Sequence, residues 1–322
     1  TKKSESYLSF QKKQIVLKTT ELYFKLIART NQHREKKEIF KLHKKRFSNA
    51  SKLYSNGSIT KIDFLRYKSD LESSRIAKEI AENEQKNAKA DLHIFVGKKI
   101  SDVHNLNTEI EIANNHYDPS RVLEIAKSKY EIIEMANYDL DISQNTYESN
   151  KSQHFPTIDL IASYDYSDVT GGTRFGANKR ESSSVGLTIT LPIYQGGYQS
   201  AKVSESRYRL ENAQIKKEKT LKLLEKEITD KIARYDIQKG KVQNEREKYN
   251  LHNLKYIAAK EGFRAGIYTD TELQQSKIEL LNAKNSYIDS VLNFVLLDLD
   301  IKKYKYKIGI DEIKEINSIL VW

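Results

Sequence analysis

Residues 228–266 read ITDKIARYDIQKGKVQNEREKYNLHNLKYIAAKEGFRAG, and an apolar or aromatic residue returns at every seventh position. The repeated positions are Ile228, Tyr235, Val242, Tyr249, Tyr256 and Phe263, with Gly266 three residues further on. A strict repeat of seven predicts a helix that packs a narrow seam against a second helix. The glycine predicts the turn at which that helix ends.

The same pattern occurs a second time near the beginning of the sequence. Its members are Leu26, His33, Phe40, Phe47 and Tyr54, again with a glycine, Gly57, three residues further on. Gly57 and Gly266 lie 209 residues apart, and so does each pair of corresponding seam residues. A pattern repeated at one fixed offset predicts an internal duplication. Each copy is expected to hold a long helix, a glycine turn and a second helix.

The composition favours long helices over a large globular core. Mean hydropathy is −0.69, 38% of residues are hydrophobic and 31% are charged, which suits narrow apolar stripes with wide solvated faces. Only three prolines occur in 322 residues, and an interior proline costs a helix about 3 kcal/mol. The sequence contains no cysteine, which excludes disulfides and thiolate metal sites. No HExxH motif or phosphate loop occurs, so we expect neither catalysis nor a cofactor or metal.

The net charge of +11 comes from 55 lysines and arginines against 44 acids. Lysine and glutamate are mixed along the helices, as in residues 34–38 (REKKE), which predicts solvated helix faces. No zinc-finger, RRM or basic-zipper signature occurs, so no nucleic-acid partner is expected. No apolar run approaches the roughly 20 residues that a transmembrane helix needs.

Between the two helical copies the hydrophobic period changes from seven to two. Apolar residues alternate with polar ones in two runs: Ile158, Leu160, Ala162, Tyr164 and Tyr166, then Val185, Leu187, Ile189, Leu191 and Ile193. This predicts a β-hairpin, either one that crosses a membrane or an ordinary half-buried one. Helices are expected at about 6–54, 60–96, 119–154, 198–263 and 270–305. Because an isolated hairpin is marginally stable, partner chains are expected to complete the sheet.

The residues around this hairpin carry a resemblance to a known family. The segments 155–160 (FPTIDL) and 191–197 (LPIYQGG), and the turns at 54–64 and 263–273, are similar to those of the TolC-like outer-membrane channel family. The resemblance covers essentially the whole chain. It implies a mainly α fold with one β-hairpin, in which a homotrimer forms a helical barrel across the periplasm, continuous with a transmembrane β-barrel in the outer membrane.

The resemblance also implies partners and boundaries. The expected partners are a periplasmic adaptor, an inner-membrane transporter of ABC, RND or MFS type and outer-membrane lipid, in drug efflux or type I secretion. Residues 1–154 would be the first repeat, 155–197 the transmembrane hairpin and 198–322 the second repeat. Segments 97–118 and 306–322 would form a belt around the helices. Family members have a further hairpin before the first long helix, so the chain is expected to lack roughly the first quarter of its gene product.

Several residues acquire expected roles from this resemblance. Glu272 matches an acidic ring at the pore constriction, where a second family acid is replaced by Gln275. The plainer interpretation of Glu272 is an exposed acid near a helix start, which the helix dipole favours. Asp63 matches an acid that closes the tip by pairing with an arginine, and Tyr268 stands at that arginine position. A Tyr268–Asp63 hydrogen bond is therefore predicted as a weaker latch.

The turns and the strands complete the predicted sites. Gly57 and Gly266 are expected to need positive φ, and the turns that they make with Tyr54, Phe263 and Tyr268 would meet the adaptor. The membrane-facing residues would be Ile158, Leu160, Tyr164, Tyr166, Val185, Leu187, Ile189 and Leu191. Two other functions remain open from the sequence: a periplasmic adaptor (membrane fusion protein), which also has helical hairpins and β structure, and a cytosolic coiled-coil scaffold.

Overall fold

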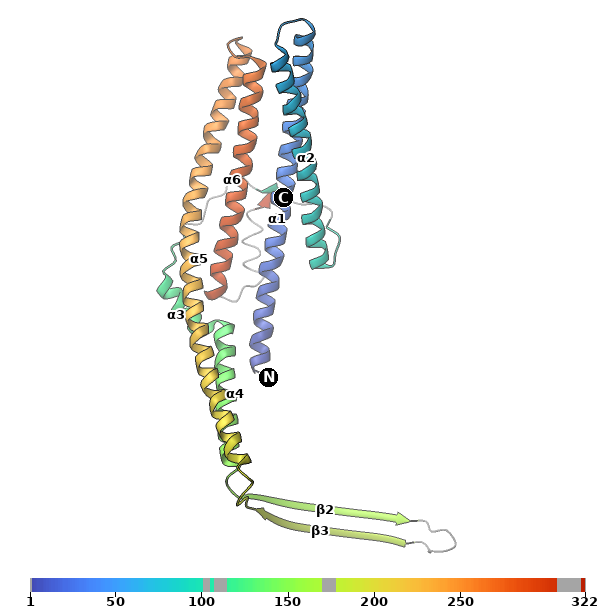
Figure 1. Cartoon of the computed structure of the whole chain (residues 1–322), viewed down its shortest axis with the longest axis vertical. Coiled ribbons are helices and arrows are strands. Elements are labelled where there is room, and N and C mark those ends of the chain that lie inside the picture. Colours follow the sequence, from blue (N-terminus) through green and yellow to red (C-terminus); the bar gives the residue numbers. More distant parts are fainter. Residues whose placement is uncertain (1, 101–104, 107–114, 170–177, 306–319, 322) are drawn as a thin grey trace. The chain divides into compact units, whose positions relative to one another are not determined.

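The computed structural model describes residues 2–100, 105–106, 115–169, 178–305 and 320–321. Its elements group into two compact units (Figure 1). One unit comprises Thr1–Lys3 and Ile132–Lys222, and the other comprises Ser4–Glu131 and Leu223–Trp322. No helix in the described ranges is both long and apolar enough to cross a bilayer.

The larger unit is built from two antiparallel pairs of helices. Helix α1 (Lys2–Ser55) pairs with α2 (Lys61–Val96), and the second part of α5 (Tyr198–Arg264) pairs with α6 (Asp270–Lys305) (Figure 1). Both pairs turn at the same end of the unit. These bounds agree with four of the five predicted helices to within a few residues. The mainly helical fold class is therefore confirmed.

The predicted seam of the first copy faces α2 along its length. Leu26 is buried with Ala88 and Leu92 of α2, and the His33 ring nitrogen Nδ1 lies 2.7 Å from the Gln85 side-chain oxygen. Near the turn, Tyr54 stacks on Phe64 of α2, with ring centroids 4.7 Å apart. The apolar seam thus becomes aromatic and more exposed toward the turn.

The second seam packs against α6 in the same way. Tyr235 is fully buried, and its ring centroid lies 4.8 Å from that of Phe294 on α6. The Tyr249 ring stacks with Tyr287 of α6 at 6.0 Å. Val242 between them is also fully buried. A repeat of seven was therefore a sound guide to which faces of α1 and α5 are covered.

The helix predicted over 119–154 is in fact two helices, α3 (Pro119–Lys129) and α4 (Glu131–Ser152). Tyr130 between them has an extended backbone. Its buried ring lies edge-on to Phe10 of α1 and to Tyr304 of α6, with centroids 6.4 and 5.1 Å away. These contacts with distant helices hold Tyr130 outside helical geometry, and the prediction of one helix was wrong.

A buried ion pair fastens α1 to the beginning of α4. The Lys13 ammonium lies 2.8 Å from the Glu131 carboxylate, and the two side chains are only 7% and 5% exposed. The Ser9 hydroxyl donates to the same carboxylate at 2.9 Å, and Lys13 also donates to the Lys303 carbonyl at 3.4 Å. Charged groups this deep are tolerated only when paired and hydrogen-bonded.

The smaller unit carries the hairpin of β2 (Thr157–Val169) and β3 (Asn178–Thr190), which confirms the predicted change of period. In the larger unit, β1 (Asn105–Leu106) pairs antiparallel with β4 (Leu320–Val321). This short ladder joins the two segments predicted as a belt. Most of those segments, and part of the connection between β2 and β3, lie outside the described residues.

Candidate functional site

The hairpin brings the predicted apolar residues of both strands onto one face. The pairs across this face include Ile158–Ile189, Leu160–Leu187 and Ala162–Val185. Because successive side chains of a strand point to opposite faces, the intervening residues form a second face, which is mainly polar and also holds Ile161. There Asp159 lies opposite Thr188, and the hydroxyls of Ser163 and Ser184 are hydrogen-bonded at 2.8 Å.

The apolar face is uncovered in the single chain. Leu160 is 73% exposed and Val185 is 78% exposed, and every residue of both strands is exposed. Tyr164 and Tyr166 continue the same face toward the far end of β2. Leu191, predicted with this set, lies one residue beyond β3 and is also exposed. At about 3.3 Å per residue, strands of 13 residues are long enough for an apolar band about 25 Å tall.

Both helix pairs turn through the same hydrogen-bonded motif. In the first turn Gly57 N donates to Tyr54 O at 3.0 Å and Ser58 N donates to Leu53 O at 2.8 Å. In the second, Gly266 N donates to Phe263 O at 3.1 Å and Ile267 N donates to Gly262 O at 2.8 Å. This is the Schellman motif, which requires positive φ at the glycine. Gly57 and Gly266 have φ of 72° and 74°, as predicted.

The helix that follows each turn begins with a threonine cap and an acid three residues later. Glu272 accepts from the amide and the hydroxyl of Thr269, both at 2.8 Å, and its own amide donates to that hydroxyl at 3.2 Å. Asp63 donates its amide to Thr60 Oγ1 at 3.1 Å and accepts from that hydroxyl at 2.7 Å. The Thr269 amide and hydroxyl lower the pKa of Glu272, which is ionised at neutral pH. Both acids therefore have a structural role as caps.

Tyr268 lies over Gly262 of the preceding helix. A Cβ added at Gly262 would stand 2.2 Å from Cδ2 of the Tyr268 ring, so a side chain there would force the ring to move. In the first turn the corresponding residues are Leu53 and Ile59. Within the described residues no hydrogen bond joins Tyr268 to Asp63, whose carboxylate accepts from Thr60 instead. The latch between them stays a prediction.

A different contact ties the last part of α1 to the beginning of α6. Asp270, the first residue of α6, accepts from Lys45 Nζ and Asn49 Nδ2 of α1, both at 3.3 Å. One turn further along α6, Gln275 accepts from Arg46 Nη1 at 3.5 Å. Sequence reasoning missed Lys45, Asn49 and Asp270, because a seam analysis pairs each helix only with its neighbour in the same copy. Lys45 and Asn49 lie off that seam, where the pattern carries no signal.

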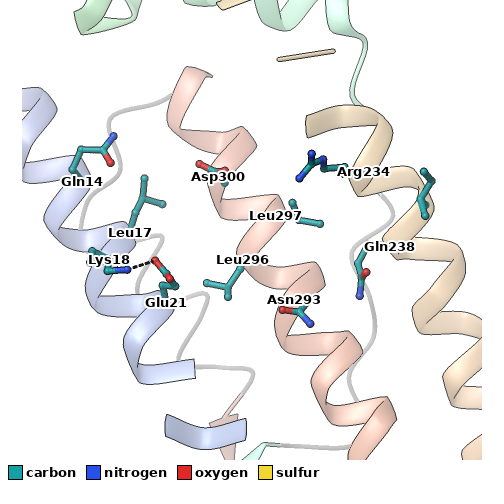
Figure 2. Close-up of a pocket in the computed structure, with 11 residues that line it drawn as sticks. Gln14, Leu17, Lys18, Glu21, Arg234, Gln238, Asn293, Leu296, Leu297 and Asp300 are labelled. Atoms are coloured by element: carbon teal, nitrogen blue, oxygen red, sulfur yellow. Dashed lines mark hydrogen bonds and ion pairs between the residues drawn. The ribbon is translucent and has the colours of Figure 1, made fainter. Parts of the chain in front are cut away.

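A groove of about 590 Å³ lies over α6, between α1 and α5 (Figure 2). Leu17, Leu296 and Leu297 supply its apolar lining, and the ion pair of Lys18 with Glu21 (3.0 Å) stands on the α1 side. Asp300 at its edge is already paired with Lys231 and, at 2.8 Å, with Lys303. The full lining is Gln14, Leu17, Lys18, Glu21, Arg234, Ile237, Gln238, Asn293, Leu296, Leu297 and Asp300.

Where α1 meets α6, Glu35 is buried and Asp289 is partly buried. Burial raises the pKa of Asp289 to about 6, and the nearby Glu35 adds to this rise while Arg29 and Lys241 oppose it. Burial also raises the pKa of Glu35, although Lys36 lies 3.0 Å away. Within the described residues Asp289 Oδ1 is buried without a hydrogen-bond partner. The folded chain therefore holds a proton on Asp289 up to a higher pH than the unfolded chain does.

Replacing Asp289 by asparagine is expected to remove a pH dependence of stability. Because the folded chain holds this proton more tightly than the unfolded chain, the free energy of unfolding should fall as pH rises from about 4 to about 6. A shift from 3.8 to about 6 corresponds to at most about 3 kcal/mol. Thermal unfolding between pH 4 and 8 measures this, with Asp141→Asn on the exposed face of α4 as control. An unchanged pH profile in Asp289→Asn would contradict the assignment.

Within the described ranges no group of three or more acidic or histidine side chains is arranged to hold a metal ion.

Residues 123–293 match the model of the outer membrane efflux protein family. The chain is 21% identical to the outer membrane protein TolC of Escherichia coli (strain K12) over 249 residues, which are 74% of this chain and 50% of TolC. It is 23% identical to the outer membrane efflux protein BepC of Brucella suis over 189 residues, 58% of this chain and 39% of BepC. The chain thus spans about half the length of the curated relatives it matches, or less.

Solved structures show the same fold. The CmeC outer membrane channel of Campylobacter jejuni aligns with a TM-score of 0.76 at 16% identity, over 99% of this chain and 68% of CmeC. The outer membrane protein VceC of Vibrio cholerae aligns with a TM-score of 0.69 at 16% identity, over 94% of this chain and 72% of VceC. At these identities the likeness concerns the arrangement of long helices and hairpin.

Proposed function

The chain belongs to the outer membrane efflux protein family, and on that premise we propose that it is one subunit of a duct through the outer membrane. In this proposal three copies surround a common axis. Helices α1, α2, α5 and α6 of each copy form a helical barrel in the periplasm, and β2 and β3 contribute to a β-barrel in the outer membrane. The duct exports small molecules or proteins.

The observation that carries the proposal is the two-faced, uncovered hairpin. Leu160, Val185 and Leu187 stand in solvent on one face, and an isolated two-stranded sheet of this kind is marginally stable in water. A lipid bilayer would cover the apolar face, and strands from other copies or other parts of the assembly would pair with the edges. The face with Asp159 and the Ser163–Ser184 pair would then line a wet interior.

The two helix pairs are proposed to be copies of one unit, at residues 1–154 and 198–322, with the hairpin at 155–197 between them. The two turns support this, because Gly57 and Gly266 close the same motif at an offset of 209. The caps at Thr60 and Thr269 repeat at the same offset. Two copies of one helical pair would let three chains supply six similar wall segments to the barrel.

The turns are proposed to be the gated end of the duct, which meets a periplasmic adaptor. An inner-membrane transporter of ABC, RND or MFS type would supply the energy. Three Glu272 carboxylates around a narrow axis would favour cations, with Gln275 one turn further on. The tie of Lys45 and Asn49 to Asp270 joins α1 to the beginning of α6 within one chain. The Tyr268–Asp63 latch is proposed to act at the turns.

Single-channel recording of the detergent-purified full-length gene product in a planar bilayer tests the duct and its constriction together. Glu272→Gln removes the charge while the glutamine amide oxygen can still accept from the Thr269 amide, so the cap is kept. We expect cation-selective openings in the wild type and a severalfold lower ratio of cation to anion permeability in Glu272→Gln. Asp63→Asn, which changes the matching cap acid of the first turn, is the control and should leave that ratio unchanged.

Each other outcome has a defined meaning. Protein that reaches the bilayer and never conducts would exclude the duct. Openings whose selectivity does not respond to Glu272→Gln would keep the duct and place the constriction elsewhere. Equal effects of the two substitutions would show that both turns line the pore.

A further inference from the structure

The positive charge of the chain is concentrated at one of its two turns. Residues 41–68, here called the basic tip, hold eight lysines and arginines and one acid, Asp63, for a net charge of +7 out of +11 for the whole chain. The corresponding residues 250–277 hold four lysines and arginines and three acids, a net charge of +1. The cations of the basic tip are Lys41, Lys44, Lys45, Arg46, Lys52, Lys61, Arg66 and Lys68.

Most of this charge has no ion-pair partner among the described residues. Lys41 pairs with Glu38 at 2.7 Å, and Lys45 pairs with Asp270. Within the described residues no carboxylate pairs with the other exposed lysines and arginines of the tip, which are Lys44, Lys52, Lys61, Arg66 and Lys68. At 1.5 Å per residue all five lie within roughly 20 Å of the turn along their helices. Like charges so close repel one another, and an anionic partner would relieve that repulsion.

The basic tip also exposes apolar side chains among the cations. Ile62 is 79% exposed, and Leu53 and Leu65 are about half exposed. In the same tip the rings of Tyr54 and Phe64 stack across the turn, with centroids 4.7 Å apart. A site for a small anion or for phosphates needs only the cations, whereas a protein interface combines an apolar centre with a polar rim. The mixture therefore favours a protein partner.

We propose that the basic tip is a docking surface for the acidic end of a partner protein, and that the α5/α6 turn contributes little to this attraction. The inference rests on the proposed function, in which the turns meet a periplasmic adaptor, and it adds the chemistry of that partner. Carboxylates around a small apolar contact would complement Lys52, Lys61 and Ile62. Such complementarity speeds association and selects the partner.

The test measures binding of a synthetic helical hairpin peptide with glutamates and a leucine at its turn to the detergent-purified protein. The same peptide with glutamines is the reference probe. We expect the glutamate peptide to bind at least about tenfold more tightly than the glutamine peptide, and less tightly as salt is raised. Lys52→Glu with Lys61→Glu should weaken binding at least about tenfold. Lys255→Glu with Lys260→Glu, the same charge change beside the other turn, should change it less than about threefold.

The proposal is overturned if the two peptides bind equally, or if both double variants weaken binding alike. Two competitors are also tested: inorganic phosphate, and vesicles of anionic lipid. The proposal is overturned if either one displaces the peptide at the same concentration of negative charge, since the surface would then bind anions in general. Bilayer recording of Lys52→Glu with Lys61→Glu separates this inference from the duct. If the double variant opens normally but no longer binds the peptide, docking is supported. If the wild type shows no openings, the duct is rejected, and the peptide-binding result still decides the docking proposal by itself.

Discussion

Replacing Lys13 by methionine is expected to lower the free energy of unfolding by about 3–5 kcal/mol. The substitution keeps the length of the side chain and removes the cation that lies 2.8 Å from Glu131. The Glu131 carboxylate would remain buried, and among the described residues the Ser9 hydroxyl would be its remaining hydrogen-bond partner. Denaturant titration of the detergent-purified protein, followed by circular dichroism, measures the change.

Two further variants show whether burial is the cause. Lys13→Met with Glu131→Leu removes both charges, and most of the lost stability should return because no charge is left unpaired. Lys18→Met breaks the pair with Glu21 on the same helix, where the side chains are 48% and 54% exposed, and should cost less than about 1 kcal/mol. A loss in Lys13→Met no larger than that in Lys18→Met would contradict a structural role for the buried pair.

The long helices and the hairpin were predictable because each carries its own local period. A repeat of seven identified the faces of Leu26 and Tyr235 that are covered by α2 and α6. A repeat of two identified the strands and their faces, since Ile158 and Ile189 share one face in the observed register. The glycine of each turn was also predictable from local sequence, because the positive φ that the turn requires concerns a single residue.

The contacts that join distant parts of the chain were not predictable from the sequence. Tyr130 interrupts a helical pattern because its ring is held by Phe10 and Tyr304, and nothing near Tyr130 in the sequence signals this. The tie between Lys45 and Asp270 joins residues more than 200 positions apart. The basic tip was detectable, but only by counting charge segment by segment, since the average over the chain conceals it.

Placing an arginine at Val185 is expected to prevent insertion of the hairpin into the outer membrane. Val185 is at the middle of the hairpin, on the apolar face opposite Ala162. An arginine at the lipid-facing midplane of a β-barrel costs about 2–4 kcal/mol, and a trimer would carry three. We expect Val185→Arg to be missing from the urea-washed outer-membrane fraction of cells and to give no channels in a planar bilayer.

Ser184, the residue before Val185, provides the control, because its side chain lies on the opposite face of the same strand. Ser184→Arg puts the same side chain at the same depth on the polar face, opposite Ser163. If that face lines a wet interior, Ser184→Arg should insert normally and shift the selectivity of the channel toward anions. Equal tolerance of both arginines would indicate a hairpin that never meets lipid. Loss of insertion in Ser184→Arg alone would mean that the polar face is the one packed away from water. Because two adjacent residues carry opposite expectations, a general effect of arginine on folding cannot produce the predicted result.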